Sequence, residues 1–183
     1  QAVQSLQAQL TEQAYRDPLT GLYNRRYLDT ALQCELEACA GAGATLALLL
    51  IDLDHFKKIN DLHGHTAGDE VLCQIAAVLL QSMRSSDICC RYGGEEFLLL
   101  MPGMGLQTAV ERAQALRQQV AERRWLACGQ PVAVTLSVGV ACASDARMQP
   151  AALIDLADRA LYQAKTEGRN RVWDLAERVY PTG

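Results

Sequence analysis

The stretch that decides the fold is Thr45-Leu46-Ala47-Leu48-Leu49-Leu50-Ile51-Asp52-Leu53, an apolar run that ends beside a carboxylate. A strand buried on both faces is continuously apolar rather than alternating. The run is also far shorter than the ~20 apolar residues that a membrane span requires. We therefore predict a buried central strand over residues 45–53.

Helical and strand patterns extend on both sides of this run. Upstream, Asn24 can cap a helix over residues 24–40. From the central strand onward the predicted order is β-α-α-β-β-α-β-α-β. A hairpin among crossover units implies an α/β (α+β) fold, with a mixed five-stranded sheet and flanking helices. The predicted helices cover residues 55–62, 67–83, 106–124 and 151–166, and the further strands cover residues 88–92, 95–101, 131–142 and 170–174.

The composition is that of one globular domain. The chain has 183 residues, 50% hydrophobic and 21% charged, with a net charge of −4. Binding to DNA or RNA rests on neutralising phosphates, so this acidic balance argues against a nucleic-acid polymer as partner. A small phosphorylated ligand in a local basic pocket is compatible with it. The seven cysteines contain no Cys-x-x-Cys motif, which favours a reduced, intracellular protein that uses cysteine as a small core residue.

The N-terminal segment has a different character. Val3, Leu6 and Leu10 follow helical 3–4 spacing, which predicts a coiled-coil-like helix, with a fraying remnant as the alternative. The chain begins within this pattern and shows no signal peptide or membrane span, so we expect a cytoplasmic fragment whose full-length protein could be membrane-anchored upstream. The predicted divisions are a helical linker over residues 1–16, a globular domain over residues 17–175 and a tail over residues 176–183.

Paired carboxylates end the central strand. Asp52 and Asp54 are two residues apart, so strand geometry places them on one face at the strand terminus. Carboxylates that emerge from a buried strand are costly unless they are paired or bind a cation. Mg²⁺ fits, because it takes one or two carboxylates together with substrate phosphates. For Asp54, capping of the next helix is an alternative.

Two further motifs carry candidate chemistry. In Arg91-Tyr92-Gly93-Gly94-Glu95-Glu96-Phe97, two glycines at a hairpin tip allow a phosphate to approach the backbone, although a solvated tip is an alternative. Downstream of the central strand, Asn60 and Asp69 have the donor and acceptor groups to bind a guanine edge. Lys57 could hold phosphate charge, or simply be solvated.

Together these motifs resemble the GGDEF-domain diguanylate cyclases, and the likeness extends from Asp17 to about Trp173. The matching segments, in order, are Asp17-Pro18-Leu19-Thr20-Gly21-Leu22-Tyr23-Asn24-Arg25-Arg26, Asp52-Leu53-Asp54-His55-Phe56-Lys57-Lys58-Ile59-Asn60, His63-Gly64-His65 through Gly68-Asp69, Gly93-Gly94-Glu95-Glu96-Phe97, Ala164-Lys165 and Gly168-Arg169-Asn170. The resemblance implies a fold like that of nucleotide cyclases and the polymerase palm. It also implies condensation of two GTP into cyclic di-GMP with release of pyrophosphate.

The resemblance assigns roles to individual residues. Asp52, Glu95 and the Leu53 carbonyl would bind the metal, Mg²⁺ or alternatively Mn²⁺. Glu95 would also be the general base on the ribose 3′-hydroxyl, Glu96 would assist at the metal, and Lys57 would stabilise the transition state. The residues expected to bind substrate are Asn60 and Asp69 at guanine, Lys165 and Arg169 at the triphosphate, and Phe56 and His65 in the same pocket.

The same resemblance implies partners and regulation. One domain binds one GTP, so the reaction needs a two-fold homodimer with facing active sites, assembled with help from the N-terminal helix. Arg84 and Asp87 resemble the family's product-inhibition site for cyclic di-GMP, the alternative being a surface ion pair. Ala115 stands where a further arginine often assists, although Arg112 and Arg117 are close. We expect an upstream sensor domain in the full-length protein. The rival functions are a catalytically silent GTP or cyclic di-GMP sensor and a cyclase of another class.

Overall fold

The structure is a computed structural model that describes residues 13–143 and 148–175. The predicted tail over residues 176–183 and most of the predicted helical linker over residues 1–16 lie outside this range. Within the described residues, no helix is both long and apolar enough to cross a membrane.

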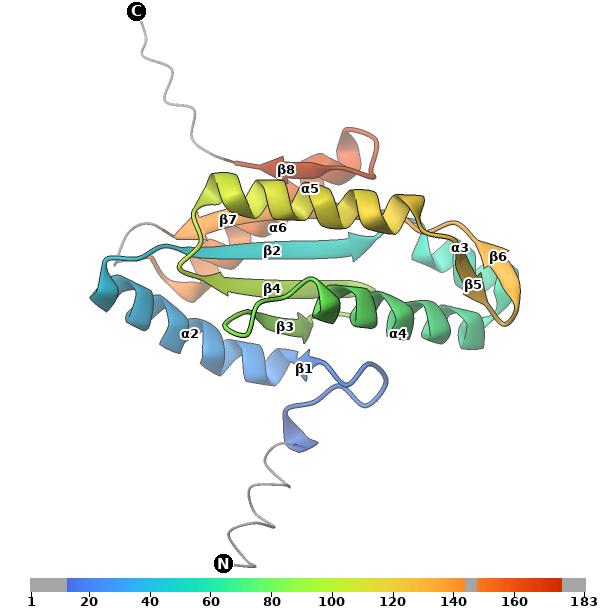
Figure 1. Ribbon diagram of the computed structural model, residues 1–183, viewed down its shortest axis with the longest axis horizontal. Helices are drawn as coiled ribbons and strands as arrows, with labels where there is room; N and C mark the ends of the chain where they lie inside the picture. The colour runs from blue at the N-terminus through green and yellow to red at the C-terminus, as the bar shows by residue number, and fades with distance from the viewer. Residues whose placement is uncertain (1–12, 144–147, 176–183) are drawn as a thin grey trace, which may run out of the picture.

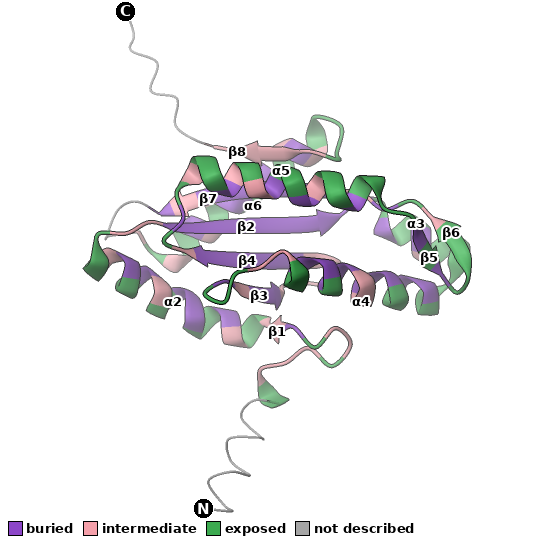
Figure 2. Ribbon diagram, in the orientation of Figure 1, coloured by how far each residue is buried: buried purple, intermediate pink, exposed green. Residues whose placement is uncertain are grey.

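One mixed sheet of six strands forms the centre of the molecule (Figure 1). Strand β2 lies between β4 and β7 and is antiparallel to both, while the β1–β3 and β7–β8 pairs are parallel. Every residue of β2 is buried (Figure 2), which confirms the predicted central strand. In spatial order the strands are β1 (Tyr23–Asn24), β3 (Ile88–Arg91), β4 (Glu96–Pro102), β2 (Leu46–Leu53), β7 (Leu136–Ala143) and β8 (Val172–Asp174).

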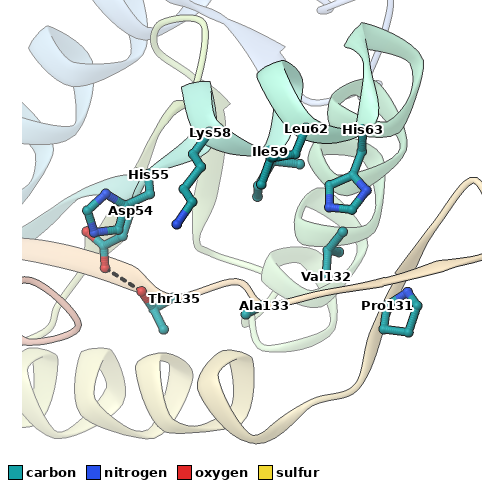
Figure 3. Close-up of a pocket in the computed structure, with 10 residues that line it drawn as sticks. All are labelled: Asp54, His55, Lys58, Ile59, Leu62, His63, Pro131, Val132, Ala133 and Thr135. Atoms are coloured by element: carbon teal, nitrogen blue, oxygen red, sulfur yellow. Dashed lines mark hydrogen bonds between the residues drawn. The ribbon is translucent and has the colours of Figure 1, made fainter.

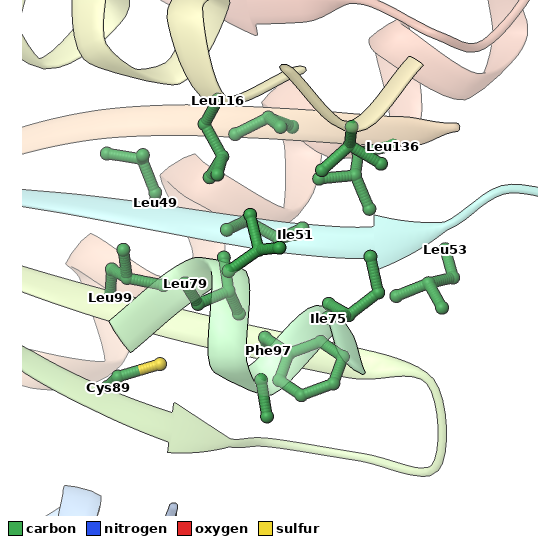
Figure 4. Close-up of a cluster of buried hydrophobic side chains, with 14 of the residues drawn as sticks. Leu49, Ile51, Leu53, Ile75, Leu79, Cys89, Phe97, Leu99, Leu116 and Leu136 are labelled. Carbon is green, nitrogen blue, oxygen red and sulfur yellow. The ribbon is translucent and has the colours of Figure 1, made fainter. Parts of the chain in front are cut away.

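The described part of the chain contains five helices: α2 (Arg25–Ala42), α3 (Phe56–His63), α4 (His65–Gln81), α5 (Leu106–Glu122) and α6 (Pro150–Thr166). Side chains of β2 alternate between two buried clusters. Leu49 and Ile51 pack with α4 and α5 (Figure 4), whereas Leu48 and Leu50 pack with α2 and α6. The sheet is therefore covered on both faces, which explains why the decisive segment is apolar without alternation. As predicted, Asn24 caps α2 by accepting a hydrogen bond from the Tyr27 N–H.

Two details of the predicted strand pattern are wrong. The main sheet has six strands rather than five, because the two-residue strand β1 pairs with β3. The strand predicted over residues 131–142 is divided into β6 (Gln130–Val132) and β7, and β6 pairs with β5 (Trp125–Ala127) in a separate hairpin. Its turn contains Cys128 and Gly129, both with positive φ. Cysteine is not typical of such turns, so the sequence pattern did not indicate this hairpin.

Gly139 on β7 allows α6 to lie close to the sheet. A Cβ at this position would be 2.1 Å from the Ala157 carbonyl oxygen and 2.4 Å from the Leu161 nitrogen, and both atoms belong to the α6 backbone. Backbone atoms cannot rotate away as a flexible side chain can. A side chain at residue 139 therefore requires α6 to shift, and α6 carries Lys165 into the candidate site described below.

We expect Gly139→Ala to destabilise the fold by roughly 1–3 kcal/mol, the range for overpacking of a close-packed core. Chemical denaturation followed by circular dichroism measures the change. Gly105→Ala is the matched control, because a Cβ at residue 105 meets nothing within 4 Å. Equal stability of the two variants would contradict the close α6–β7 contact.

Candidate active site

An acidic cluster forms where β2 and β4 lie side by side. Asp52 is directly opposite Glu96 in the β2–β4 register, and the Leu53 N–H donates to the Glu95 carbonyl at 3.2 Å. Directly opposed residues of antiparallel strands point to the same face, which brings these carboxylates together. Asp52 is only 5% exposed. The charge of Asp52 also acts on Glu95, so three carboxylates from two segments lie near one another at one end of the sheet.

The cluster carries excess negative charge in a partly buried setting. Lys165, from the last turn of α6, pairs with Asp52 through a 2.7 Å contact between Nζ and Oδ2. Burial nevertheless raises the pKa of Asp52 above its ordinary value. Burial and then the charge of Asp52 raise the pKa values of Glu95 and Glu96 as well. Carboxylates held in this way favour a cation beside them.

Asp54 has a different role from Asp52. Its carboxylate accepts hydrogen bonds from Thr135 Oγ1 at 2.7 Å, Ser137 Oγ at 2.6 Å and the Asn170 N–H at 2.9 Å. The helix-capping alternative is wrong, because the N-cap of α3 is His55 and no side chain caps that helix. Asp54 instead fastens the end of β2 to β7 and to the turn that contains Arg169.

The glycine hairpin is held from two sides. A Cβ on Gly93 would lie 2.6 Å from Glu96 Oε2, so the glycine leaves room for that carboxylate. Arg91 donates to the Gly94 carbonyl through Nη2 at 2.7 Å. The same guanidinium reaches Asp17 Oδ1 at 3.2 Å. One arginine thus links the N-terminal turn to the tip that precedes Glu95.

Asp17 provides a pH-dependent test of this link. Burial alone would raise the pKa of Asp17, but hydrogen bonds from Thr20 and the charge of Arg91 together lower it below 3.8. Because the folded pKa is depressed, the stabilisation is present above the ordinary value and is lost as the pH falls through the folded value. Asp17→Asn should lower the melting temperature at pH 7. The corresponding loss in the free energy of unfolding should be at most ~1 kcal/mol.

This difference between wild type and Asp17→Asn should shrink on titration to pH 3. Asp29→Asn, at an exposed position on α2, is the control and should change little at either pH. A penalty for Asp17→Asn that is the same at both pH values would show that the charge of Asp17 is not what stabilises the turn.

The candidate base-binding residues lie between α3 and α4. Asn60 Oδ1 is buried and has no hydrogen-bond partner among the described residues. A Cβ on Gly68 would lie 1.9 Å from that oxygen and 3.1 Å from Phe56 Cζ, so α4 approaches α3 closely only because residue 68 is glycine. An unpaired buried amide oxygen costs ~1–3 kcal/mol unless a donor satisfies it. Asp69, the next residue, is exposed on α4.

The other residues predicted to bind substrate lie on α3, at the start of α4 or beside the acidic cluster. Lys57 is exposed on α3, one residue after Phe56. His65 is exposed at the start of α4, and its side chain makes no hydrogen bond among the described residues. Arg169 follows α6 with φ of 61° and is exposed, yet its charge lowers the pKa of Asp52. The structure therefore brings Lys165 and Arg169 to the acidic cluster, whereas no ion pair or side-chain hydrogen bond among the described residues links His65 to it.

Arg84 and Asp87 do not form the surface ion pair that was the alternative interpretation. The Asp87 side chain is fully buried and pairs with Arg112 Nη1 of α5 at 2.9 Å. Asp87 Oδ2 also accepts from the Arg84 backbone N–H at 2.9 Å, while Oδ1 has no partner among the described residues. The Arg84 side chain is exposed. Arg112, rather than Arg84, is therefore the guanidinium that pairs with Asp87.

Sequence reasoning named the acidic and basic groups but missed two supporting residues: Gly68 as the space for Asn60, and Arg91 as the clamp on the hairpin. It noted Arg112 as a nearby arginine without identifying Asp87 as its partner. Only Gly68 left a signal, because a glycine inside a helical pattern often has a packing or functional reason.

A six-stranded mixed sheet with an acidic cluster at the end of its central strand is the architecture of a nucleotidyl cyclase domain. The sequence matches the family "Diguanylate cyclase, GGDEF domain" over residues 14–171. The chain belongs to this family of GGDEF domains.

Relatives and solved structures agree with this assignment. The chain is 43% identical over 163 residues to "Response regulator PleD" of Caulobacter vibrioides, and 39% identical over 157 residues to "Diguanylate cyclase DosC" of Escherichia coli. These alignments cover 88% and 85% of this chain but only 36% and 34% of those proteins, so the chain spans about a third of their length.

Among solved structures, the coiled coil and GGDEF domain of DgcB from Caulobacter crescentus, in complex with cyclic di-GMP, superposes with a TM-score of 0.89 at 30% identity. That match covers 94% of this chain and 91% of the other. The active GGEEF domain of a diguanylate cyclase from Vibrio cholerae gives 0.77 at 34% identity, covering 82% and 95%.

Proposed function

We propose that this domain is a diguanylate cyclase, which condenses two GTP into cyclic di-GMP and releases two pyrophosphates. The observation that carries the proposal is the buried Asp52, grouped with Glu95 and Glu96 beside Lys165. Carboxylates with raised pKa values next to a lysine are suited to phosphate chemistry, which depends mainly on positioning and charge stabilisation. The catalytic domain would occupy residues 17–175. Its GTP substrate favours a cytoplasmic location for this domain.

The donor set fits a divalent metal. The described residues contain no group of three or more His, Cys, Asp or Glu side chains that could hold an ion unaided. Mg²⁺ does not need one, because it combines one or two carboxylates with substrate phosphates. Asp52, Glu95 and the Leu53 carbonyl would hold Mg²⁺, or Mn²⁺ in its place. A bound metal would neutralise phosphate charge and lower the pKa of a nearby hydroxyl.

The remaining residues divide the work of binding and proton transfer. Glu95 accepts the proton of the ribose 3′-hydroxyl, and its raised pKa brings it nearer to the range useful for a general base. Glu96 assists beside the metal. Lys165 exchanges its contact with Asp52 for the triphosphate and is joined there by Arg169. Lys57 stabilises the charge that develops on the leaving pyrophosphate.

Guanine would bind between α3 and α4. The buried Asn60 Oδ1 needs a donor, and the guanine edge offers N–H groups to it and to the Asp69 carboxylate. Phe56 packs beside Asn60, and His65, exposed at the start of α4, would support the bound substrate. Adenine lacks the N1–H donor, so a site built for guanine rejects it.

The reaction requires two copies of the chain. Each domain holds one GTP, and each 3′-hydroxyl attacks the α-phosphate held by the other, so the active sites face each other in a two-fold dimer. The N-terminal helix would help to bring the copies together. Two heptads dimerise weakly by themselves, which makes activity sensitive to protein concentration.

The direct test is incubation of the chain with GTP and Mg²⁺, followed by chromatography and mass spectrometry of the product. Cyclic di-GMP is the expected product, formed faster per copy at higher protein concentration and not formed from ATP. Binding of GTP or cyclic di-GMP without turnover would identify a silent sensor, and a mononucleotide ring would identify a cyclase of another class.

Product inhibition would act through Arg84 and Asp87. The buried Asp87 Oδ1, which has no partner among the described residues, would accept from a guanine, and the exposed Arg84 would donate to its edge or to a phosphate. We expect Arg84→Ala to relieve inhibition by added cyclic di-GMP at least tenfold while the initial rate at low product stays unchanged. Progress curves with and without added product measure this.

Arg159→Ala, which removes an exposed arginine from α6, is the matched control and should remain as sensitive as wild type. If added product slows wild type and Arg84→Ala equally, inhibition acts at the catalytic pocket instead.

A further inference from the structure

A cavity of about 430 Å³ lies on the side of α3 that faces β6 and the segment leading into β7 (Figure 3). Its volume is within the range of small-molecule pockets. One wall comes from α3 and the opposite wall from residues 131–135, so two segments far apart in the sequence enclose it. None of the residues given catalytic or substrate roles above lines it.

The walls are apolar. Ile59 and Leu62 project from α3, and Pro131, Val132 and Ala133 face them from the other side. Leu62 is 68% exposed, which is unusual for a leucine on a short helix that otherwise buries Phe56 and Ile59. Covering such a side chain with an apolar body removes it from water and is favourable.

Two side chains with nitrogen donors, Lys58 and His63, also line the cavity. In Figure 3 the Lys58 side chain extends from α3 across the cavity toward residues 133–135, and the His63 ring projects over Val132. Lys58 takes part in no ion pair recorded among the described residues. The one acid in the lining, Asp54, already accepts hydrogen bonds from Thr135, Ser137 and Asn170. Among the described residues, the cavity therefore has a cation without an ion-pair partner above an apolar floor.

The cavity is separate from the face of α3 that carries Asn60. Successive helical residues are about 100° apart, so Asn60 projects about 160° away from both Lys58 and Leu62. Its amide is instead directed at Gly68 of α4. A ligand in the cavity and a nucleotide at Asn60 would occupy different sides of the same helix.

We infer that this cavity is a second ligand site, which takes a small organic carboxylate with a compact apolar body. The body lies between Leu62, Ile59 and Val132, and the carboxylate accepts hydrogen bonds from Lys58 Nζ and the His63 ring. A charge-assisted bond to lysine gives the site its preference for an anion. Binding does not require cyclase activity, so the inference stands apart from the proposed function.

The test uses 2-naphthoate as the probe, with the neutral 2-naphthalenemethanol and acetate as comparison ligands. Each is titrated into the isotopically labelled chain, and amide chemical shifts are followed by NMR. We expect naphthoate to shift the amides of residues 55–63 and 132–135. The neutral analogue and acetate should bind at least tenfold more weakly, because one lacks the charge and the other the apolar body.

Two variants with matched controls localise the interaction. Lys58→Glu and Leu62→Asp should each weaken naphthoate binding at least tenfold. Arg159→Glu makes the same charge change on α6, and Leu80→Asp makes the same change at another exposed leucine, on α4; both should bind like wild type. All four positions are exposed, and melting temperatures verify that the variants fold.

Three results would overturn the inference. The first is binding of naphthoate no tighter than that of the neutral analogue. The second is a set of shifted amides centred on residues 165–170, which would place the carboxylate among the candidate phosphate-binding groups. The third is wild-type binding by Lys58→Glu. Loss of naphthoate binding leaves the cyclase proposal intact, and a chain that makes no cyclic di-GMP leaves this one intact.

Discussion

Glu95→Gln should reduce cyclic di-GMP formation by a hundredfold or more while making the metal-free domain more stable. The loss follows because one substitution removes a metal ligand and the general base, and removal of a single group that stabilises transition-state charge already costs ~10²–10³ in rate. Product formation from GTP and Mg²⁺ measures activity, and thermal unfolding measures stability.

The gain in stability has a definite pH dependence. Burial and the neighbouring Asp52 raise the pKa of Glu95, so the folded protein holds a proton that the unfolded chain has released. The ionised carboxylate therefore lowers the free energy of unfolding. This destabilisation is absent below the unfolded pKa and develops as the pH rises through the folded pKa. Glu95→Gln should therefore raise the melting temperature at pH 8 and change it little at pH 4.

Glu111→Gln, on the exposed face of α5, should leave both activity and stability close to wild type. Near-normal product formation by Glu95→Gln would refute the assignment of Glu95. Loss of activity with a lower melting temperature at pH 8 would mean that Glu95 supports the fold rather than the chemistry.

Gly68→Ala should raise the KM for GTP at least tenfold without unfolding the protein. The added Cβ would lie 1.9 Å from Asn60 Oδ1, so the amide has to leave the position in which it faces the space between α3 and α4. Alanine is otherwise favoured over glycine inside a helix by ~1 kcal/mol, which offsets part of the strain. Steady-state kinetics with GTP and with ATP measure the affinity and the base selectivity.

Gly41→Ala is the matched control, because it makes the same change inside α2, where a Cβ meets nothing within 4 Å. It should raise the melting temperature and leave the KM unchanged. An unchanged KM in Gly68→Ala would show that Asn60 does not bind the base.

The sequence alone determined the features that depend on local pattern and burial. The continuous apolar run of β2 identified the buried central strand, and the apolar stripe over residues 151–166 identified α6, because both patterns report which faces leave water. Asn24 identified the start of α2, since an N-cap acts on its own next turn. The ordered motifs named the family, and the comparisons confirmed it.

The tertiary structure decided everything that depends on which distant residues meet. Strand β1 has two residues and exists only because β3 offers it a parallel edge. Asp54 and Asp52 look equivalent in sequence, yet Thr135 and Ser137 bind the first while Lys165 pairs with the second.

In the same way, Asp87 pairs with Arg112 rather than with Arg84, three residues away, and Gly68 acquires its role only where α4 packs against Asn60. Local periodicity records whether a side chain is buried. It carries no information on which partner, from another part of the chain, will satisfy its charge or fill the space beside it.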